Sequence, residues 1–126
     1  MSDRVILTLP RERPFFAVAR LVLGGLATRL DVTVEHLEDL ELALDGLLER
    51  RDGGQQITLS LEVEGDEFVA SIGPFHGGEL RAELESDPGD GVSLRRLLDA
   101  VVDRYAVSDR EDGAWVELGK RFQRGS

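Results

Sequence analysis

The stretch QQITLSLEVEGDEFVASI, from Gln55 to Ile72, carries the strongest structural signal in the sequence. Apolar residues alternate strictly with polar ones along its first half, at Ile57, Leu59, Leu61 and Val63. Alternation with a period of two is typical of a strand with one buried and one wet face. The residues EGDE predict a turn, and Phe68 to Ile72 predict the returning strand. The stretch therefore predicts a β-hairpin.

Two helices are predicted before this hairpin. PFFAVARLVLGGLATRL, from Pro14 to Leu30, has apolar residues at helical spacing, and we expect its buried stripe to be Phe15, Val18, Val22, Leu26 and Leu30. Its other faces are also apolar, which indicates a helix that is mostly buried or contacts a partner. The pair Gly24 and Gly25 weakens it, and we interpret the pair as a site of close packing.

The second predicted helix begins after Thr33, a good N-cap residue, and continues through TVEHLEDLELALDGLLERR. We expect it to end at Gly53 and Gly54. Its buried stripe is predicted to be Leu37, Leu40, Leu44, Leu47 and Leu48, with the acidic residues on the remaining surface.

Downstream of the hairpin, the sequence predicts a loop, a third long helix and a final hairpin. The loop spans Gly73 to Gly91 and has the pattern of a short helix near Leu80 to Leu84. The third helix, VSLRRLLDAVVDRYAV, should face inward at Leu94, Leu97, Leu98, Val101 and Tyr105. RYAVSD and AWVELGKRF form the hairpin around the turn REDG. At the start of the chain, RVILTLP, from Arg4 to Pro10, predicts a first strand.

This order of elements predicts an α+β fold. Paired hairpins favour an antiparallel or mixed sheet, and amphipathic helices favour cover on one face of it. We therefore expect a two-layer sandwich with three helices on one side of the sheet. A length of 126 residues fits one domain, with a core from about residue 4 to residue 122.

The composition narrows the classes of function. Acidic residues outnumber basic ones by 25 to 15, so the formal net charge is −10. This disfavours nucleic-acid binding and favours a basic protein partner. The alternative is that the acidic residues serve only to keep the protein soluble. The chain has no cysteine, which excludes disulfides and thiolate metal sites. His36 and His76 lack metal-ligand spacing. No apolar run predicts a signal peptide or a membrane span, so we expect a cytoplasmic protein.

Four segments, in this order and spacing, carry a resemblance to a known family. They are LTLP, VARLVLGGLATRL, LEDLELALDGLL and GDGVSLRRLLDAVVDRYAV. Together they resemble the anti-sigma regulatory factors, a serine/threonine-kinase-like branch of the histidine-kinase-type ATPase (GHKL) superfamily. The resemblance implies the same two-layer fold and a role in regulating transcription through protein binding.

The nucleotide site that the resemblance implies is altered at each motif. The family's catalytic glutamate falls on Gly46, and its magnesium-binding asparagine falls on Arg50; the chain contains no asparagine at all. In the family, an aspartate that binds the adenine amino group is followed two residues later by a glycine. Here Ser71 stands at the position of the aspartate, and Gly73 matches the glycine. Gly89 and Gly91 match the phosphate loop, but Asp90 between them would repel phosphate. We interpret Arg50 as a solvated residue at a helix end, with pairing to a phosphate as the alternative.

These observations favour a regulator that has lost nucleotide chemistry. Its partner would be a sigma factor or an anti-anti-sigma protein, and no cofactor is expected. The candidate contact residues are Glu35, Glu38, Asp39 and Glu41, together with the EVEGDE hairpin. One alternative is an active serine kinase of an anti-anti-sigma protein, which would need ATP and magnesium. Another is a small α+β domain for assembly or ligand binding. Members of the family often pair, and the apolar first helix would suit a homodimer.

Overall fold

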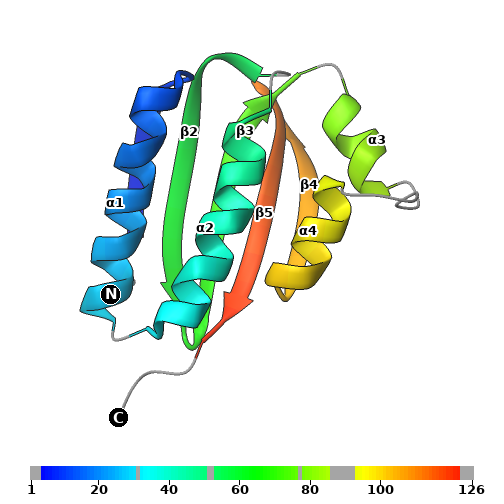
Figure 1. Cartoon of the computed structure of the whole chain (residues 1–126). Helices are drawn as coiled ribbons and strands as arrows, with labels where there is room; N and C mark the ends of the chain where they lie inside the picture. Colours follow the sequence, from blue (N-terminus) through cyan, green and yellow to red (C-terminus); the bar gives the residue numbers. More distant parts are fainter. Residues whose placement is uncertain (1–3, 31, 51–52, 77, 86–92, 123–126) are drawn as a thin grey trace.

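The computed structural model describes residues 4–30, 32–50, 53–76, 78–85 and 93–122. Five strands form one antiparallel sheet in the order β1-β2-β3-β5-β4. Figure 1 shows the helices gathered on one face of this sheet. The elements, in chain order, are β1 (Arg4–Pro10), α1 (Arg13–Arg29), α2 (Val34–Leu48), β2 (Gly53–Glu64), β3 (Glu67–Phe75), α3 (Glu79–Glu85), α4 (Leu94–Val101), β4 (Arg104–Arg110) and β5 (Gly113–Arg121).

The fold is the two-layer α+β sandwich that the sequence predicts. All strand pairs are antiparallel, and the described ranges contain a fourth, short helix, α3. The central hairpin is confirmed, because β2 buries Ile57, Leu59, Leu61 and Val63 on one face. Its turn uses Gly65, whose φ of 62° lies in the left-handed region that glycine adopts without strain.

The core lies between the helices and the inner face of the sheet. Leu40, Leu44, Leu47 and Leu48 of α2 are at most 1% exposed, as predicted, while Leu37 is only partly buried. Thr33 caps α2, since its hydroxyl accepts a hydrogen bond from the backbone N–H of His36 at 3.4 Å. The acidic and leucine-rich pattern of this segment therefore predicts its orientation correctly.

The predicted buried stripe of α1 is wrong by one residue over most of its length. The structure buries Phe16, Ala19, Leu23, Leu26 and Ala27, whereas Phe15 and Val18 are each 36% exposed. Because nearly all faces of α1 are apolar, two stripes have helical spacing. Contact with the sheet selects between them.

The glycine pair of α1 also differs from expectation. A Cβ atom added at Gly24 or Gly25 would meet no heavy atom within 4 Å. The pair therefore mediates no close packing within the described part of the chain. Both glycines lie inside a helix, where each costs about 1 kcal/mol relative to alanine.

Two predicted element ends are also corrected. The second helix ends at Leu48, with Glu49 as C-cap, and Gly53 belongs to β2, where it pairs with Phe75. The third helix ends at Val101, so Tyr105 lies on β4. Tyr105 still packs partly against the core, and its hydroxyl donates a hydrogen bond to Asp99 at 2.6 Å.

Candidate functional site

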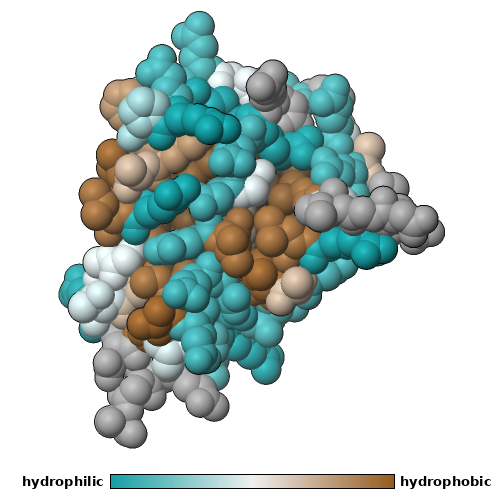
Figure 2. Space-filling model, in the orientation of Figure 1, coloured by the Kyte–Doolittle hydropathy of each residue, from teal (hydrophilic) through white to brown (hydrophobic). Residues whose placement is uncertain are grey.

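A pocket of about 290 Å³ lies where the C-terminal end of α2 meets α3 and the start of α4. Two of the predicted nucleotide-site positions, Gly46 and Arg50, lie in its wall. The complete lining consists of Gly46, Arg50, Glu83, Ser93, Leu94 and Leu97. Figure 2 shows hydrophobic surface where α2 meets α4. The structure thus brings together the altered glutamate and asparagine positions of the second helix.

Arg50 is not the solvated residue that the sequence suggests. Its side chain is 14% exposed, and its Nη1 donates to Oε2 of Glu83 at 2.5 Å. Its backbone carbonyl accepts a hydrogen bond from Nη1 of Arg11. Arg50 therefore joins the end of α2 to α3 as an ion pair, which corrects the sequence-based interpretation.

The carboxylate of Glu83 also binds the N-terminal end of α4. Its second oxygen, Oε1, accepts a hydrogen bond from the backbone N–H of Leu94 at 3.1 Å. The Ser93 hydroxyl accepts from the backbone N–H of Arg96 at 3.2 Å. A helix N-terminus offers its free N–H groups to anions. Here a carboxylate and a hydroxyl of the chain itself already occupy two of them.

Leucine side chains of α4 cover the position of the expected catalytic glutamate. A Cβ atom at Gly46 would lie 2.9 Å from Cδ2 of Leu97 and 3.3 Å from Cδ1 of Leu94. A longer side chain at this position requires Leu97 to move. The wall of the pocket near Gly46 is therefore apolar and offers no group for acid–base chemistry.

Ser71 and Gly73 lie on the opposite face of the sheet from this pocket. Ser71 pairs across the sheet with Ser60 and Glu117, and residues paired across strands share a face. Its neighbours Ala70 and Ile72 point into the core. The described ranges place no helix over this outer face. The structure therefore separates Ser71 from Gly46 and Arg50.

Gly73 has a packing role on that outer face. A Cβ atom there would lie 2.6 Å from Cδ2 of Trp115 and 3.0 Å from the carbonyl oxygen of Ala114. Trp115 is 7% exposed, its indole lies against Gly73, and the Arg110 guanidinium carbon stacks over the ring at 4.1 Å from its centroid. The remaining two predicted positions, Gly89 and Gly91, lie outside the described residues.

The four acidic candidates of α2 do not form one patch. Glu35 and Glu38 are exposed, and Glu41 is half-buried. Asp39 faces the sheet side of α2, where Nζ of Lys120 on β5 donates to its Oδ2 at 3.0 Å. Asp39 is thus engaged in an ion pair that ties α2 to the sheet, and the exposed acid of α2 is concentrated at Glu35 and Glu38.

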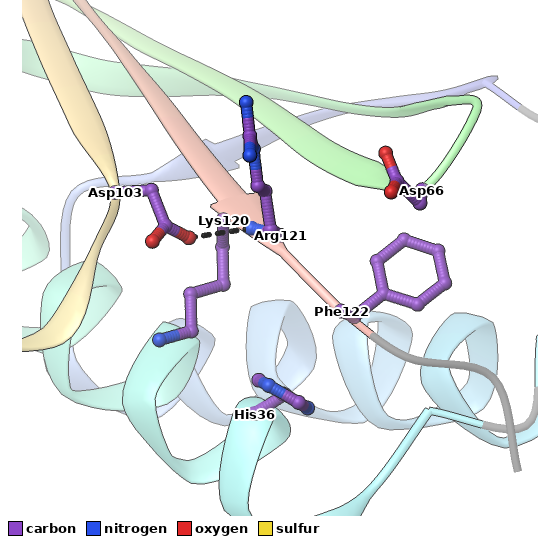
Figure 3. A pocket seen from close by; sticks show the side chains of 6 residues that line it. All are labelled: His36, Asp66, Asp103, Lys120, Arg121 and Phe122. Atoms are coloured by element: carbon purple, nitrogen blue, oxygen red, sulfur yellow. Dashed lines mark hydrogen bonds between the residues drawn. The ribbon is translucent and has the colours of Figure 1, made fainter.

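A second hollow, of about 490 Å³, lies at the N-terminal end of α2 (Figure 3). Figure 3 shows Lys120 extending toward α2 and Asp103 accepting from the backbone N–H of Arg121, at 2.6 Å. The lining is His36, Asp66, Asp103, Lys120, Arg121 and Phe122. Its lining carries two acids, Asp66 and Asp103, and two bases, Lys120 and Arg121, and Lys120 also pairs with Asp39. Charges of both signs therefore line this hollow.

Arg104 on the outer face of the sheet bridges two carboxylates. It donates to Glu67 at 2.8 Å and to Glu117 at 3.1 Å. The hydrogen bonds from Arg104 lower the pKa of Glu67 below its ordinary value. The same contacts raise the pKa of Arg104. These groups hold β3, β4 and β5 together and lie away from the pocket of Gly46 and Arg50.

The lowered pKa of Glu67 predicts that the stability of the fold depends on pH. The lowered pKa of folded Glu67 stabilises the fold above the pKa of the unfolded chain, and this contribution is lost as the pH falls through the folded pKa. We expect Glu67→Gln to cost about 0.5 kcal/mol at pH 7 and nothing in strong acid. Urea unfolding at a series of pH values measures this, with exposed Glu64→Gln as the control. If Glu67→Gln lowered the stability equally in strong acid and at pH 7, the effect would come from packing and not from the charge of Glu67.

Within the described ranges, no group of three or more His, Asp or Glu side chains is arranged to hold a metal ion. None of the helices described there has the length and apolar character needed to cross a membrane. No protein-family model matches the sequence, and no curated protein matches it either. The geometry of the site is therefore the main support for a function.

Proposed function

We propose that this protein is a regulator of the anti-sigma type that acts by binding another protein, without nucleotide chemistry. The observation that carries the proposal is the position of the Glu83 carboxylate. It holds Arg50 and the N-terminal end of α4, where the resemblance would place the phosphates of a nucleotide. An anionic ligand at this point would have to displace a carboxylate of the chain.

Two further features of the pocket support the proposal. Leu97 packs against Gly46, so the position of the general base carries no functional group. Ser71, the counterpart of the adenine-reading aspartate, lies on the other face of the sheet. Phosphoryl transfer depends on positioned charge and metal ions. The two charged side chains that line this pocket, Arg50 and Glu83, pair with each other.

The partner we propose is a sigma factor or an anti-anti-sigma protein in the cytoplasm. A sigma factor binds DNA and therefore presents basic surface. The chain has a net charge of −10, and α2 exposes Glu35 and Glu38, with Glu41 half-buried beside them. Charge complementarity between such surfaces mainly raises the rate of association.

Thermal melting with Mg-ATP tests the loss of nucleotide binding. A ligand that binds only the folded state raises its stability by about 2.7 kcal/mol at a hundredfold excess over its dissociation constant. We expect no change in the melting temperature at about 1 mM Mg-ATP, which is saturating for a micromolar site. A clear rise would show that other residues rebuild the site, and the proposal would fail.

Association kinetics test the contact surface. Changing Glu35, Glu38 and Glu41 together to glutamine should slow association with the partner roughly tenfold at low salt. The matched control changes Glu79, Glu85 and Glu111, three exposed acids outside α2 and the β2–β3 hairpin, and alters the net charge equally. The readout is surface plasmon resonance at two salt concentrations, with the protein that co-purifies with the wild type. Equal slowing by both triple variants would show that only net charge acts.

A further inference from the structure

The edge strand β1 lacks the features with which proteins usually block the edge of a sheet. The sheet ends at β1 and at β4, and among the described strands β1 pairs with β2 alone. An edge strand presents a row of backbone N–H and C=O groups that another strand can pair with, and charged side chains are a common protection. Between Arg4 at its start and Pro10 at its end, β1 reads VILTL and carries no charge.

The opposite edge of the sheet is protected. β4 begins with Arg104 and ends with Asp109 and Arg110. Asp109 also pairs with Arg81 of α3 at 2.9 Å, which holds this helix at the end of the strand. Of the two edges formed by the described strands, β1 is therefore the one suited to accept a further strand.

The β1 side chains that face the helices are less buried than their counterparts on β2. Leu59 and Leu61 are 1% and 2% exposed, whereas Leu7 and Val5, which pair with them across the sheet, are only half-buried. Residues paired across two strands share a face, so all four point toward the helical layer. The apolar inner face of the sheet therefore continues to the outer edge of β1 and is partly exposed there.

α1 carries a second apolar stripe on the side that faces away from α2. Phe15, Val18 and Val22 follow one another at helical spacing; the first two are each 36% exposed, and Val22 is half-buried. At 3.6 residues per turn, this stripe lies roughly 150° around the helix from Arg20, which pairs with Asp45 of α2. Figure 2 shows hydrophobic surface over α1 on the side away from α2.

The stripe and the edge strand form two walls of a corner. α1 packs on the helical side of β1 and is the outermost helix of the layer, because α2 lies on its other side (Figure 1). A strand added beside β1, about 4.8 Å away, would lie beneath the stripe, with alternate side chains buried against it. The residues of this β1–α1 corner are Val5, Leu7, Phe15, Val18 and Val22.

We propose that the β1–α1 corner binds an extended segment of another protein, which adds a strand to the edge of the sheet. The backbone of β1 pairs with the segment, and main-chain hydrogen bonds of this kind supply affinity. Specificity comes from apolar residues at every second position of the segment, which pack beneath Phe15, Val18 and Val22. The intervening residues face solvent on the outer face of the sheet.

The charge around the corner selects a segment with acidic ends. Residues 4–29 contain five arginines and one acid, Glu12, in a chain whose net charge is −10. Arg4 is exposed on the outer face of β1, the face that Ile6 and Thr8 share. Opposite charges across an interface favour association. This partner differs from the basic one proposed for α2, so the inference goes beyond the proposed function and does not rest on it.

The probe for this surface is the synthetic peptide EVTVTVE with blocked ends, titrated into the full chain. Its valines share one face, and its threonines and terminal glutamates share the other. We expect it to bind at concentrations up to about 1 mM. The isomer EVVVTTE, which has the same composition without the alternation, should bind about tenfold more weakly or less. Failure of EVTVTVE to bind at about 1 mM, or equal binding of the two peptides, overturns the inference.

Substitutions in α1 test the apolar wall. Phe15→Glu and Val18→Glu should each weaken the binding of EVTVTVE about tenfold, because each places a carboxylate beside the valines. Ala17→Glu is the matched control, since Ala17 is exposed and lies three residues from Arg20, on the side toward α2. All three changes are at exposed positions of one helix and alter the net charge equally. Equal weakening by Ala17→Glu would assign the effect to net charge and overturn the proposed corner.

A charge exchange tests the acidic ends of the segment. The wild type should bind EVTVTVE more tightly than KVTVTVK, and salt should reduce the difference. Arg4→Glu should weaken the binding of the first peptide and strengthen that of the second. Binding of both peptides with equal affinity by the wild type contradicts the charge selection.

Amide hydrogen exchange, followed by NMR, distinguishes strand addition from contact through side chains alone. EVTVTVE should slow exchange about tenfold or more at alternate residues of β1, those whose N–H groups point away from β2. Binding that slows no β1 amide, or that slows β4 amides in their place, overturns the inference. So does protection of these β1 amides before peptide is added. Protection that is lost on dilution would identify a second copy as the occupant, and protection at every concentration would identify a segment of the same chain.

Discussion

Replacing Gly73 with alanine is expected to lower the free energy of unfolding by about 3 kcal/mol. The added methyl would lie 2.6 Å from Cδ2 of Trp115 and 3.0 Å from the backbone oxygen of Ala114. The ring cannot stay against β3, and the backbone oxygen cannot yield without disturbing β5. Trp115 is the one tryptophan of the chain, so its fluorescence reports the change directly. We expect red-shifted emission in the folded variant and a lower urea midpoint.

Gly25→Ala is the matched control for this prediction. Gly25 lies inside α1, and a Cβ atom there would meet nothing within 4 Å. Alanine should raise the free energy of unfolding by about 1 kcal/mol, because it favours the helix and restricts the unfolded chain. If Gly73→Ala were neutral with unchanged emission, Trp115 would not lie against Gly73, and the packing role of this glycine would be refuted.

Replacing Glu83 with alanine is expected to cost about 2 kcal/mol of stability. It removes the carboxylate that pairs with Arg50, whose side chain is only 14% exposed, and it leaves the backbone N–H of Leu94 without its carboxylate acceptor. Loss of one member of a largely buried ion pair leaves an uncompensated charge. The cost stays below that of a fully buried pair, because Glu83 is 36% exposed.

A double-mutant cycle with Arg50→Met measures the coupling of the two side chains. We expect the double variant to be about 1 kcal/mol more stable than the sum of the two single changes predicts. Glu79→Ala, an exposed acid on the same helix, is the control and should change stability by less than about 0.5 kcal/mol. Additive effects of Glu83→Ala and Arg50→Met would show that the ion pair does not stabilise the contact between the end of α2 and α3.

The sequence predicts the strands and the second helix well, because their patterns allow one solution. Alternation from Ile57 to Val63 leaves a single apolar face, and a shift of register by one would expose it. α2 has a cap at Thr33 and a leucine stripe with acid on the other side. In both segments, local pattern and burial agree.

α1 shows where such reasoning fails. Phe15 and Phe16 are equally apolar neighbours, and both belong to stripes with helical spacing. Only the contact with the sheet determines that Phe16 is buried and Phe15 is 36% exposed. A helix with apolar residues on most of its faces does not encode its own orientation, so tertiary packing must select it.

At the candidate site, too, the sequence predicts some features and only the tertiary structure decides others. The sequence alone identifies Gly46 and Arg50 as altered positions, and the structure places both in one pocket. It does not identify Glu83, which is 33 residues from Arg50 and belongs to an acidic segment with no pattern that distinguishes one carboxylate. Ser71 and Gly73 occupy the positions of another motif of the resemblance, but they lie on the other face of the sheet.

By itself, the sequence determined the order of elements, the α+β class, the two hairpins and the residue types at the altered site, because these follow from local periodicity and composition. The tertiary structure alone decided which face of α1 is buried, that Arg50 pairs with Glu83, and that Trp115 packs on Gly73. Each of these contacts joins residues that are distant in the chain or chooses between equivalent local patterns. Their energies arise only when the helices and the sheet have come together.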